Sequence, residues 1–113
     1  MSNRMEVYNK YDGHCAYCGK DISIKDMQVD HIVPKCHGGT DGIENLNPSC
    51  RRCNHYKRGN SLEAFRGMVE KIPEKLMERQ YIFKVGVDYG FFEPHGRKVQ
   101  FYFERREESE VEE

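Results

Sequence analysis

Residues 29–39 read VDHIVPKCHGG. Apolar and polar residues alternate over residues 27–33, which predicts a short β-strand, and Pro34 ends it because proline has no N–H for a strand ladder. The glycine pair that closes the stretch predicts a loop. A histidine after an acid at the end of a strand is by default a structural residue. Asp30 and His31 therefore gain a chemical role only if other parts of the chain supply partners.

The composition fits a soluble globular protein. The chain has 113 residues, of which 37% are hydrophobic and 33% charged, and its formal net charge is −1. This length predicts one domain. No apolar run is long enough to cross a membrane, and the N-terminus has no apolar signal segment. We therefore expect a cytoplasmic protein in a reducing compartment, with no membrane partner.

Five cysteines divide into two CxxC pairs and one single residue. Cys15 and Cys18 form the first pair, Cys50 and Cys53 form the second, and 31 residues separate the pairs. Two such units supply the four thiolates of a tetrahedral structural zinc site, and neither lies in the βαβ pattern of a redox CxxC. We expect a closed zinc site that holds the fold and takes no part in chemistry. Cys36 has no partner and is assigned no role.

The segment between the two cysteine pairs predicts a strand, a long loop and a second strand, and the second pair opens a helix. The second extended stretch covers residues 46–49. Residues 50–58 contain no helix breaker until Gly59, which predicts a short helix that ends at this glycine. The resulting ββα unit, with the zinc site joining its two ends, places the chain in the α+β class. We expect residues 1–60 to form this core.

The rest of the chain predicts an extension of the same domain over residues 61–104. Ser61 is a good N-cap for a helix. The apolar residues of this helix fall on one face at helical spacing: Leu62, Phe65, Met68, Val69 and Ile72. Beyond them the apolar period changes to two, which predicts a C-terminal β-hairpin with strands in residues 81–93 and 97–104. Residues 105–113 are acidic and are predicted to be disordered.

The predicted ββα unit brings the end of its first strand over the first turn of its helix. Asp30 and His31 would then lie near Asn54, with His55 beside it. Carboxylate and amide oxygens suit Mg²⁺ or a similar hard ion, and an imidazole with an ordinary pKa of about 6.5 takes a proton from water at neutral pH. This set of groups suits metal-assisted hydrolysis of a phosphodiester.

The densest cluster of basic side chains lies in the same helix, and its members are Arg51, Arg52, Lys57 and Arg58. A charge cluster is usually a solvated surface, but beside such a site these residues would contact phosphates, and a local patch needs no basic protein overall. The site residues have structural alternatives as well. Asp30 could be a cap or form a salt bridge, Asn45 could be a turn residue, and Asn54 could cap the cysteine knuckle.

Four motifs together resemble a known family: CAYCG at residues 15–19, VDHIVP at 29–34, GGTDGIENL at 38–46 and CRRCNHYK at 50–57. In this order and spacing they resemble the HNH endonucleases of the ββα-metal type, in particular the zinc-clamped branch common in phage and bacterial proteins. VDHIVP also appears in the HNH nuclease domain of RNA-guided CRISPR effectors. The resemblance covers residues 12–59, about half of the chain.

The resemblance implies a role for each matching residue. His31 corresponds to the general base that activates water, and Asp30 corresponds to a ligand of the catalytic ion. Asn45 corresponds to the residue that braces the loop and so orients the histidine. Asn54 stands where the motif has its last histidine and would be the second ligand, which makes this chain an HNN variant. His55 is the alternative ligand, but on a helix it would point about 100° away from Asn54.

The resemblance further implies a metal-dependent endonuclease with a structural Zn²⁺ and a catalytic Mg²⁺ or Mn²⁺. The expected substrate is double-stranded DNA, nicked or cut through to give 5′-phosphate and 3′-hydroxyl ends, in the cytoplasm of a bacterium or a phage-infected host. Cutting both strands would require a homodimer or a second encounter, because one HNH site cuts one strand. The alternative is a zinc-stapled nucleic-acid-binding module, or a subunit of a phage or restriction complex that cannot cleave alone.

Overall fold

The computed structural model describes residues 4–112, and side chains through residue 109. The chain divides into two compact units. The first comprises the residues up to Leu62 together with those from Gln100 onward, and the second comprises Glu63–Val99. The core boundary expected at residue 60 lies close to this division, but the end of the chain belongs to the first unit. Within the described residues, no helix is both long enough and apolar enough to cross a membrane.

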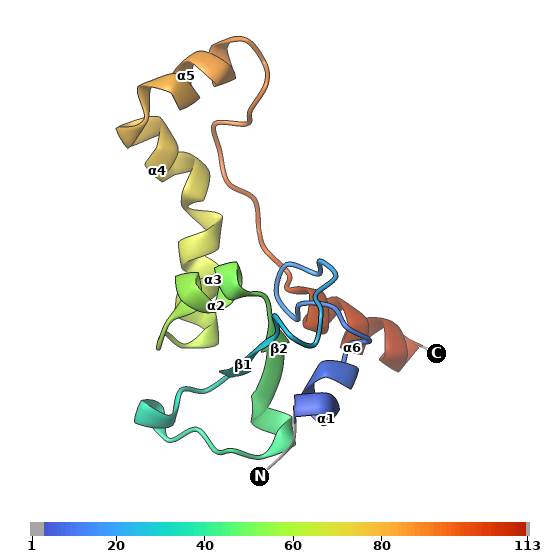
Figure 1. Ribbon diagram of the computed structural model, residues 1–113. Coiled ribbons are helices and arrows are strands. Elements are labelled where there is room, and N and C mark those ends of the chain that lie inside the picture. Colours follow the sequence, from blue (N-terminus) through green and yellow to red (C-terminus); the bar gives the residue numbers. More distant parts are fainter. Residues whose placement is uncertain (1–3, 113) are drawn as a thin grey trace. The chain divides into compact units, whose positions relative to one another are not determined.

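The first unit contains the ββα element that the sequence predicts (Figure 1). Strand β1 (Gln28–His31) pairs antiparallel with strand β2 (Leu46–Ser49), and Asp30 lies opposite Asn47 in the register. Helix α2 (Arg51–Lys57) follows β2 after a single residue. The predicted α+β class is therefore confirmed, and the end of β1 that carries the acid and the histidine is held by its pairing with β2.

An N-terminal helix that the sequence analysis did not identify, α1 (Arg4–Asn9), packs on the small sheet. Val7 of this helix is buried with Met27 and Leu46, and five partly buried hydrophobic side chains surround these three. The Lys10 ammonium group, just after the helix, donates to the carbonyl oxygen of Leu46 at 2.5 Å. Helix α1 thus covers β2 and supplies the apolar surface that a two-stranded sheet cannot bury alone.

The loop between the strands is shaped by two 3-10 helices, η1 (Lys35–His37) and η2 (Ile43–Asn45). Between them the backbone of Gly39 passes against Val33, and a Cβ at this glycine would lie 1.7 Å from the Val33 carbonyl oxygen. Because no side chain fits into that gap, a residue other than glycine would force the loop away from the end of β1.

Helix α2 ends one residue earlier than predicted. Its first turn is capped by the Cys50 sulfur, which accepts from the Cys53 N–H at 3.3 Å. At the other end Arg58, not Gly59, takes the positive φ, at 52°, while its N–H donates to the Asn54 carbonyl oxygen at 3.0 Å. Gly59 was the expected stop because glycine adopts a positive φ without steric cost, and here a non-glycine residue adopts it.

The second unit consists of three helices and an extended return segment. The first two are α3 (Leu62–Glu70), which begins at the junction of the units and confirms the predicted helix after Ser61, and α4 (Ile72–Arg79), which has Pro73 in its first turn. The third is α5 (Tyr81–Asp88).

The predicted C-terminal β-hairpin is wrong, and its first strand is the helix α5. The helix ends in a Schellman motif: Gly90 has φ +82°, its N–H donates to the Val87 carbonyl at 2.9 Å, and the Phe91 N–H donates to the Gly86 carbonyl at 2.9 Å. Phe92 then folds back against Gly86, where a Cβ would lie 2.5 Å from its ring. The β-branched and aromatic content of this stretch favoured a strand, but these tertiary and capping contacts favour a helix.

The second predicted strand fails because its backbone groups have other partners. The N–H of Val99 donates to a Glu70 carboxylate oxygen at 2.8 Å, and its carbonyl accepts from Arg66 at 2.7 Å. Both partners are side chains of α3, so residue 99 is extended without a neighbouring strand. Among the residues that the structure describes, β1 and β2 form the one sheet.

Residues 102 onward form helix α6 (Tyr102–Glu112) in place of a strand and a disordered tail. The Glu104 carboxylate accepts from the N–H of Phe101 at 2.8 Å, which is half of a capping box. Phe101 and Phe103, which as alternating aromatics predicted a strand, are both buried and both meet the Tyr17 ring edge-on. Residue 113, the last of the predicted tail, lies outside the described residues.

Candidate active site and metal centre

The four cysteines of the two CxxC pairs form one cluster. The sulfur atoms of Cys15, Cys18, Cys50 and Cys53 all lie within 4.8 Å of one another. A tetrahedral zinc ion with bonds of 2.3 Å separates its sulfurs by about 3.8 Å, and the Sγ atoms of Cys18 and Cys50 are 3.9 Å apart. The hydrogen bond between Cys15 and Cys53 lowers the pKa of Cys15 to about 4 and raises the pKa of Cys53, so the two sulfurs share a proton that a metal ion would displace. The donor set therefore fits zinc.

Cys36 stands apart from this cluster. It lies exposed in η1, it is a free cysteine, and it is not among the cysteines that the structure brings together.

Asp30 lies in the interior of the first unit and is 5% exposed. Its carboxylate accepts a hydrogen bond from the Tyr17 hydroxyl and forms an ion pair with the Lys57 ammonium group, 3.2 Å from Oδ2. Burial raises the pKa of the Asp30 carboxyl, while the Tyr17 hydrogen bond and the Lys57 charge oppose that rise. The salt bridge considered as a structural alternative for Asp30 is thus present.

Lys57 is not a phosphate contact, and this prediction is corrected. Its side chain is fully buried, and its ammonium group donates to the His31 carbonyl oxygen at 3.0 Å as well as facing Asp30. The lysine therefore fixes the backbone of His31 and the side chain of Asp30 at the same time. Such a group is held by its partners because a buried ammonium without them is strongly unfavourable.

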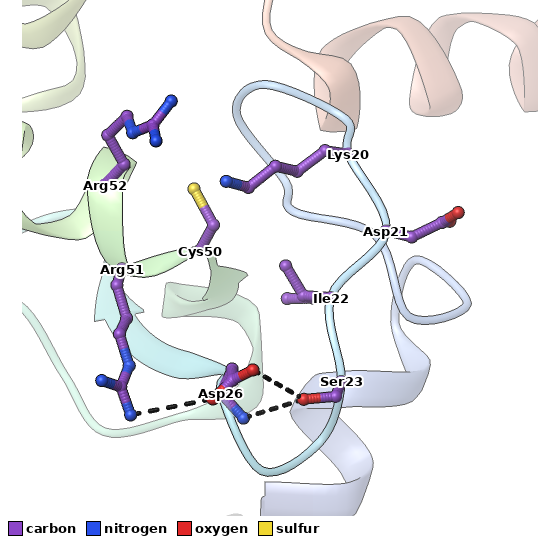
Figure 2. Close-up of a pocket in the computed structure, with 8 residues that line it drawn as sticks. All are labelled: Lys20, Asp21, Ile22, Ser23, Asp26, Cys50, Arg51 and Arg52. Atoms are coloured by element: carbon purple, nitrogen blue, oxygen red, sulfur yellow. Dashed lines mark hydrogen bonds and ion pairs between the residues drawn. The ribbon is translucent and has the colours of Figure 1, made fainter.

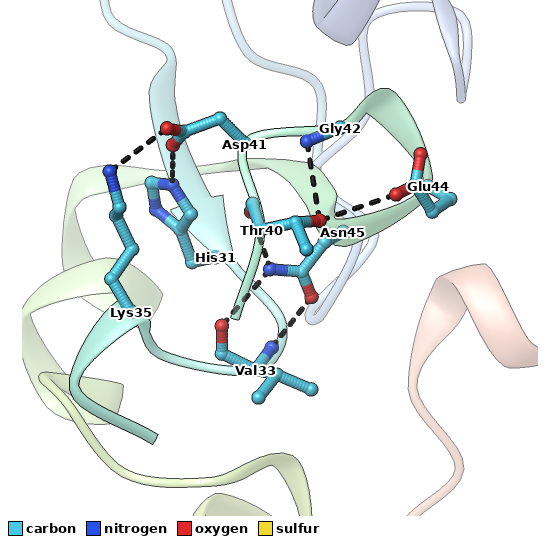
Figure 3. A network of polar contacts seen from close by, with 8 residues as sticks. All are labelled: His31, Val33, Lys35, Thr40, Asp41, Gly42, Glu44 and Asn45. Atoms are coloured by element: carbon cyan, nitrogen blue, oxygen red, sulfur yellow. Dashed lines mark hydrogen bonds and ion pairs between the residues drawn. The ribbon is translucent and has the colours of Figure 1, made fainter. Parts of the chain in front are cut away.

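The side chain of His31 faces the loop between the strands (Figure 3). Its Nε2 lies 2.8 Å from Oδ1 of Asp41, and Oδ2 of the same carboxylate lies 2.9 Å from the Lys35 ammonium. Lys35 and then His31 hold the pKa of Asp41 below its ordinary value. The sequence analysis missed Asp41, although it sits inside the GGTDGIENL motif, because nothing in a single sequence tells a contact residue of a loop from a turn residue.

Asn45 ties the two ends of that loop together. Its buried side chain accepts from the Val33 N–H at 2.8 Å and donates to the carbonyl oxygens of Val33 and Thr40 at 3.0 and 2.8 Å. All three bonds appear in Figure 3, with Asp41 following directly after Thr40. This geometry is what a residue that braces the loop requires, and it exceeds what a simple turn residue provides.

One hollow of about 350 Å³ is bordered by three of the four predicted catalytic residues, and Asn45 is not among its lining residues. It is lined by Val29, Asp30, His31, Pro34, Lys35, Asn54 and Arg58. Residues from β1, the loop and α2 thus border one space, with the Asp30 carboxylate itself buried against Tyr17 and Lys57. Arg58 and Lys35 add positive charge there. His55 is exposed and does not line this hollow, so the helix directs Asn54 and not His55 towards it.

The remaining basic residues of α2 face a second hollow, beside the cysteine cluster (Figure 2). Arg51 and Arg52 are exposed there together with Lys20, and Arg51 lies 3.7 Å from the Asp26 carboxylate. The predicted basic cluster therefore divides into three environments: the second hollow, the interior and the hollow that holds His31.

Comparisons with known proteins agree with this geometry. Residues 15–70 match the family model described as HNH endonuclease. The CRISPR-associated endonuclease Cas9 of Corynebacterium diphtheriae is 41% identical over 59 residues, which are 51% of this chain and 5% of that protein. The Cas9 of Actinomyces naeslundii is 43% identical over 44 residues, 38% of this chain and 4% of the relative.

A solved structure is similar as well. The crystal structure of the Type II-C Cas9 enzyme from Actinomyces naeslundii superposes with a TM-score of 0.52 and 31% identity, over 57% of this chain and 7% of that one. Residues 15–70 belong to the HNH endonuclease family, as a domain that resembles a small part of Cas9. The chain spans 4–5% of the length of the curated relatives that it matches.

Proposed function

We propose that this protein is a metal-dependent endonuclease that hydrolyses DNA phosphodiester bonds, with His31 as the general base. The observation that supports the proposal is that Asp30, His31 and Asn54 all line one hollow. A binding module has no need of a base beside a pair of hard oxygen donors. The Arg58 guanidinium at the same hollow supplies a charge that a phosphate would contact.

The residues support a specific division of labour. His31 takes a proton from a water molecule in the hollow as that water attacks phosphorus in line with the departing 3′ oxygen. Asp30 and Asn54 would hold a divalent ion, for which carboxylate and amide oxygens are suitable, Mg²⁺ or Mn²⁺ in particular. When bound, the ion supplies stabilisation of the negative charge that develops on the phosphate and the leaving oxygen. Products with 5′-phosphate and 3′-hydroxyl ends follow from this direction of attack.

The cysteine cluster has a separate function in this proposal. Four sulfur ligands leave no open coordination position, so a zinc ion there would hold the two ends of the ββα unit and would not reach the substrate. With one active hollow per chain, a single encounter would nick one strand of double-stranded DNA. A double-strand break would need a second copy or a second encounter.

A second candidate function is a zinc-stapled nucleic-acid-binding module, or a subunit of a phage or restriction complex that needs a partner for cleavage. Two observations favour it: the net charge is −1, and the similar domain in the relatives is a small part of a much longer chain. The complete set of Asp30, His31, Asn45 and Asn54 favours the enzyme.

A plasmid-nicking assay separates the two candidates. Zinc-loaded protein with Mg²⁺ or Mn²⁺ should convert supercoiled plasmid to nicked circles that DNA ligase reseals, because ligase requires a 5′-phosphate and a 3′-hydroxyl. Without the added ion nicking should stop. This omission is a better control than a strong chelator, which would also strip structural zinc. Binding without nicking under every ion would contradict the enzyme and favour the module.

A further inference from the structure

We propose that Asp41 is a positioning residue for His31: its carboxylate fixes the orientation of the imidazole and its tautomer, so that Nδ1 is the nitrogen that accepts the proton from water. This inference rests on the proposed role of His31 as general base. The contact that carries it is the 2.8 Å distance between Nε2 of His31 and Oδ1 of Asp41.

The direction of the hydrogen bond follows from the chemistry of the two groups. An ionised carboxylate only accepts hydrogen bonds, so Nε2 must carry the hydrogen that it shares with Asp41. A neutral imidazole has one N–H and one lone pair, and the lone pair is therefore left on Nδ1. A ring held in this way presents one defined basic nitrogen, whereas a free ring samples both tautomers and several orientations.

The loop holds Asp41 in place before any substrate arrives. Lys35 binds its second oxygen at 2.9 Å, and Asn45 fixes the carbonyl oxygen of the preceding residue, Thr40, at 2.8 Å. The close passage of Gly39 against Val33 fixes the other side of the same loop. The carboxylate is thus anchored through its own side chain and through its backbone neighbour.

The contact has more influence on the direction of the ring than on stability. The side chains of His31 and Asp41 are 28% and 48% exposed, and an ion pair at such a site adds little to the free energy of unfolding. For a histidine that binds a metal, loss of such a hydrogen-bond partner typically costs 10- to 100-fold in metal affinity or activity, and we expect a loss of similar size for a histidine that acts as a base. Asp41→Ala should therefore change the rate of catalysis far more than it changes the melting temperature.

The kinetic test compares Asp41→Ala with Glu44→Ala, a matched control that removes another exposed carboxylate of the same loop. In a nicking assay with zinc-loaded protein, Asp41→Ala should lower kcat about 10- to 100-fold with little change in KM. Asp41→Asn, which keeps the shape and one acceptor oxygen, should recover part of the loss. In a His31→Ala background the Asp41→Ala substitution should have no further effect, because the group that it positions is gone.

A spectroscopic test measures the tautomer of His31 directly and does not depend on nuclease activity. In zinc-loaded protein labelled with ¹⁵N-histidine, the His31 signals, identified by their loss in His31→Ala, should show a hydrogen on Nε2 and a lone pair on Nδ1. Asp41→Ala should turn this single tautomer into a mixture, and Glu44→Ala should leave it unchanged.

Two results would overturn the proposal. One is a wild-type His31 with its hydrogen on Nδ1, and the other is an Asp41→Ala protein that nicks as fast as Glu44→Ala. If the wild-type protein itself does not nick DNA, the proposed function fails, and the tautomer measurement still decides whether Asp41 holds the ring.

Discussion

The Lys57 ammonium group lies inside the protein, between the Asp30 carboxylate and the His31 carbonyl oxygen. It joins the two residues that the mechanism uses, one through its side chain and one through its backbone. Asp30 therefore has two functions in the proposed site: it is part of a buried ion pair, and it also lines the hollow where a divalent ion would bind. A carboxylate has enough lone pairs to accept from Tyr17 and Lys57 and still to bind a cation.

A comparison of Asn54→Ala with Asn45→Ala tests the two amides separately. If Asn54 binds the catalytic ion, its loss weakens ion binding, and higher Mg²⁺ or Mn²⁺ should partly restore nicking. Asn45→Ala removes the hydrogen bonds that hold Val33 and Thr40. His31 should then lose its orientation, and a higher ion concentration should not restore nicking. The physical difference is that mass action refills a weakened site but cannot reorient a base.

The measurement is the nicking rate of each variant as a function of ion concentration, with His55→Ala as the control. This variant should behave like the wild type, because His55 is exposed and does not line the hollow. A defect in His55→Ala that extra ion rescues, together with none in Asn54→Ala, would make His55 the second ligand.

At the level of single residues, sequence spacing predicted which residues meet but not how deeply they lie. Asp30, His31 and Asn54 were placed together from the ββα pattern, and they do line one hollow. Lys57 was misplaced because in a run of basic residues a lysine is by default exposed. Helical spacing held a signal that was not used: Lys57 is three residues after Asn54, so both share the face of α2 directed at β1.

The loop from Ile32 to Glu44 contains the contacts that orient the His31 side chain. It has little regular structure of its own and depends on a few close contacts. The tightest of these is the approach of the Gly39 backbone to the Val33 carbonyl oxygen. Because side chains on loops are in general held less precisely than those on helices and strands, the orientation of His31 depends on these contacts.

Gly39→Ala should therefore damage both the fold and the proposed activity. The added Cβ would overlap the backbone of Val33, and relief of such an overlap costs about 1–3 kcal/mol of unfolding free energy. Gly59→Ala is the matched control, since a Cβ there meets no atom within 4 Å and should change stability by about 0.5 kcal/mol or less. Denaturant unfolding in the presence of zinc measures both. Equal stability of the two variants would show that the loop is not tightly closed at Gly39.

At the level of elements, the sequence predicted structure well where local pattern and tertiary contacts agree. Strands β1 and β2 and helices α2 and α3 belong to that group. Helices α5 and α6 were mistaken for strands, because their aromatic and β-branched residues have high strand propensity and tertiary contacts overrode it. Gly90 in the position of a helix C-cap and Glu104 three residues after Phe101 were local signals for helices, and they could have corrected the prediction.

For the whole molecule, the cysteine cluster connects segments that are far apart in the sequence. The first CxxC precedes β1 and the second follows β2, so one ion would tie both ends of the ββα unit. Helix α6, near the end of the chain, is also joined to the N-terminal part of the first unit. Arg106 forms an ion pair with Asp12 at 2.9 Å, and Phe103 packs near Tyr11. The sequence could not predict these contacts between the two ends of the chain, since no local pattern marks a contact between residues more than ninety positions apart.

Zinc removal should therefore unfold the first unit rather than only inactivate it. Cys50→Ser should lose near-stoichiometric zinc and show a much lower melting temperature, because the binding energy of a structural ion is folding energy. Cys36→Ser is the matched control: its thiol is exposed and outside the cluster, and it should keep both zinc and stability. Elemental analysis and thermal unfolding measure the two quantities. Loss of zinc from Cys36→Ser would contradict the assignment of the four ligands.

The central claim, that His31 is the general base of a nuclease, is tested most directly by the nicking rate of His31→Ala beside the wild type. Zinc content and melting temperature should be nearly the same in both proteins, because the His31 side chain is partly exposed and its contact with Asp41 adds little stability. Removal of a general base typically costs 10²–10⁴-fold in rate, so nicking with Mg²⁺ should fall by about that factor. A folded, zinc-loaded His31→Ala protein that nicks plasmid at the wild-type rate would contradict the account.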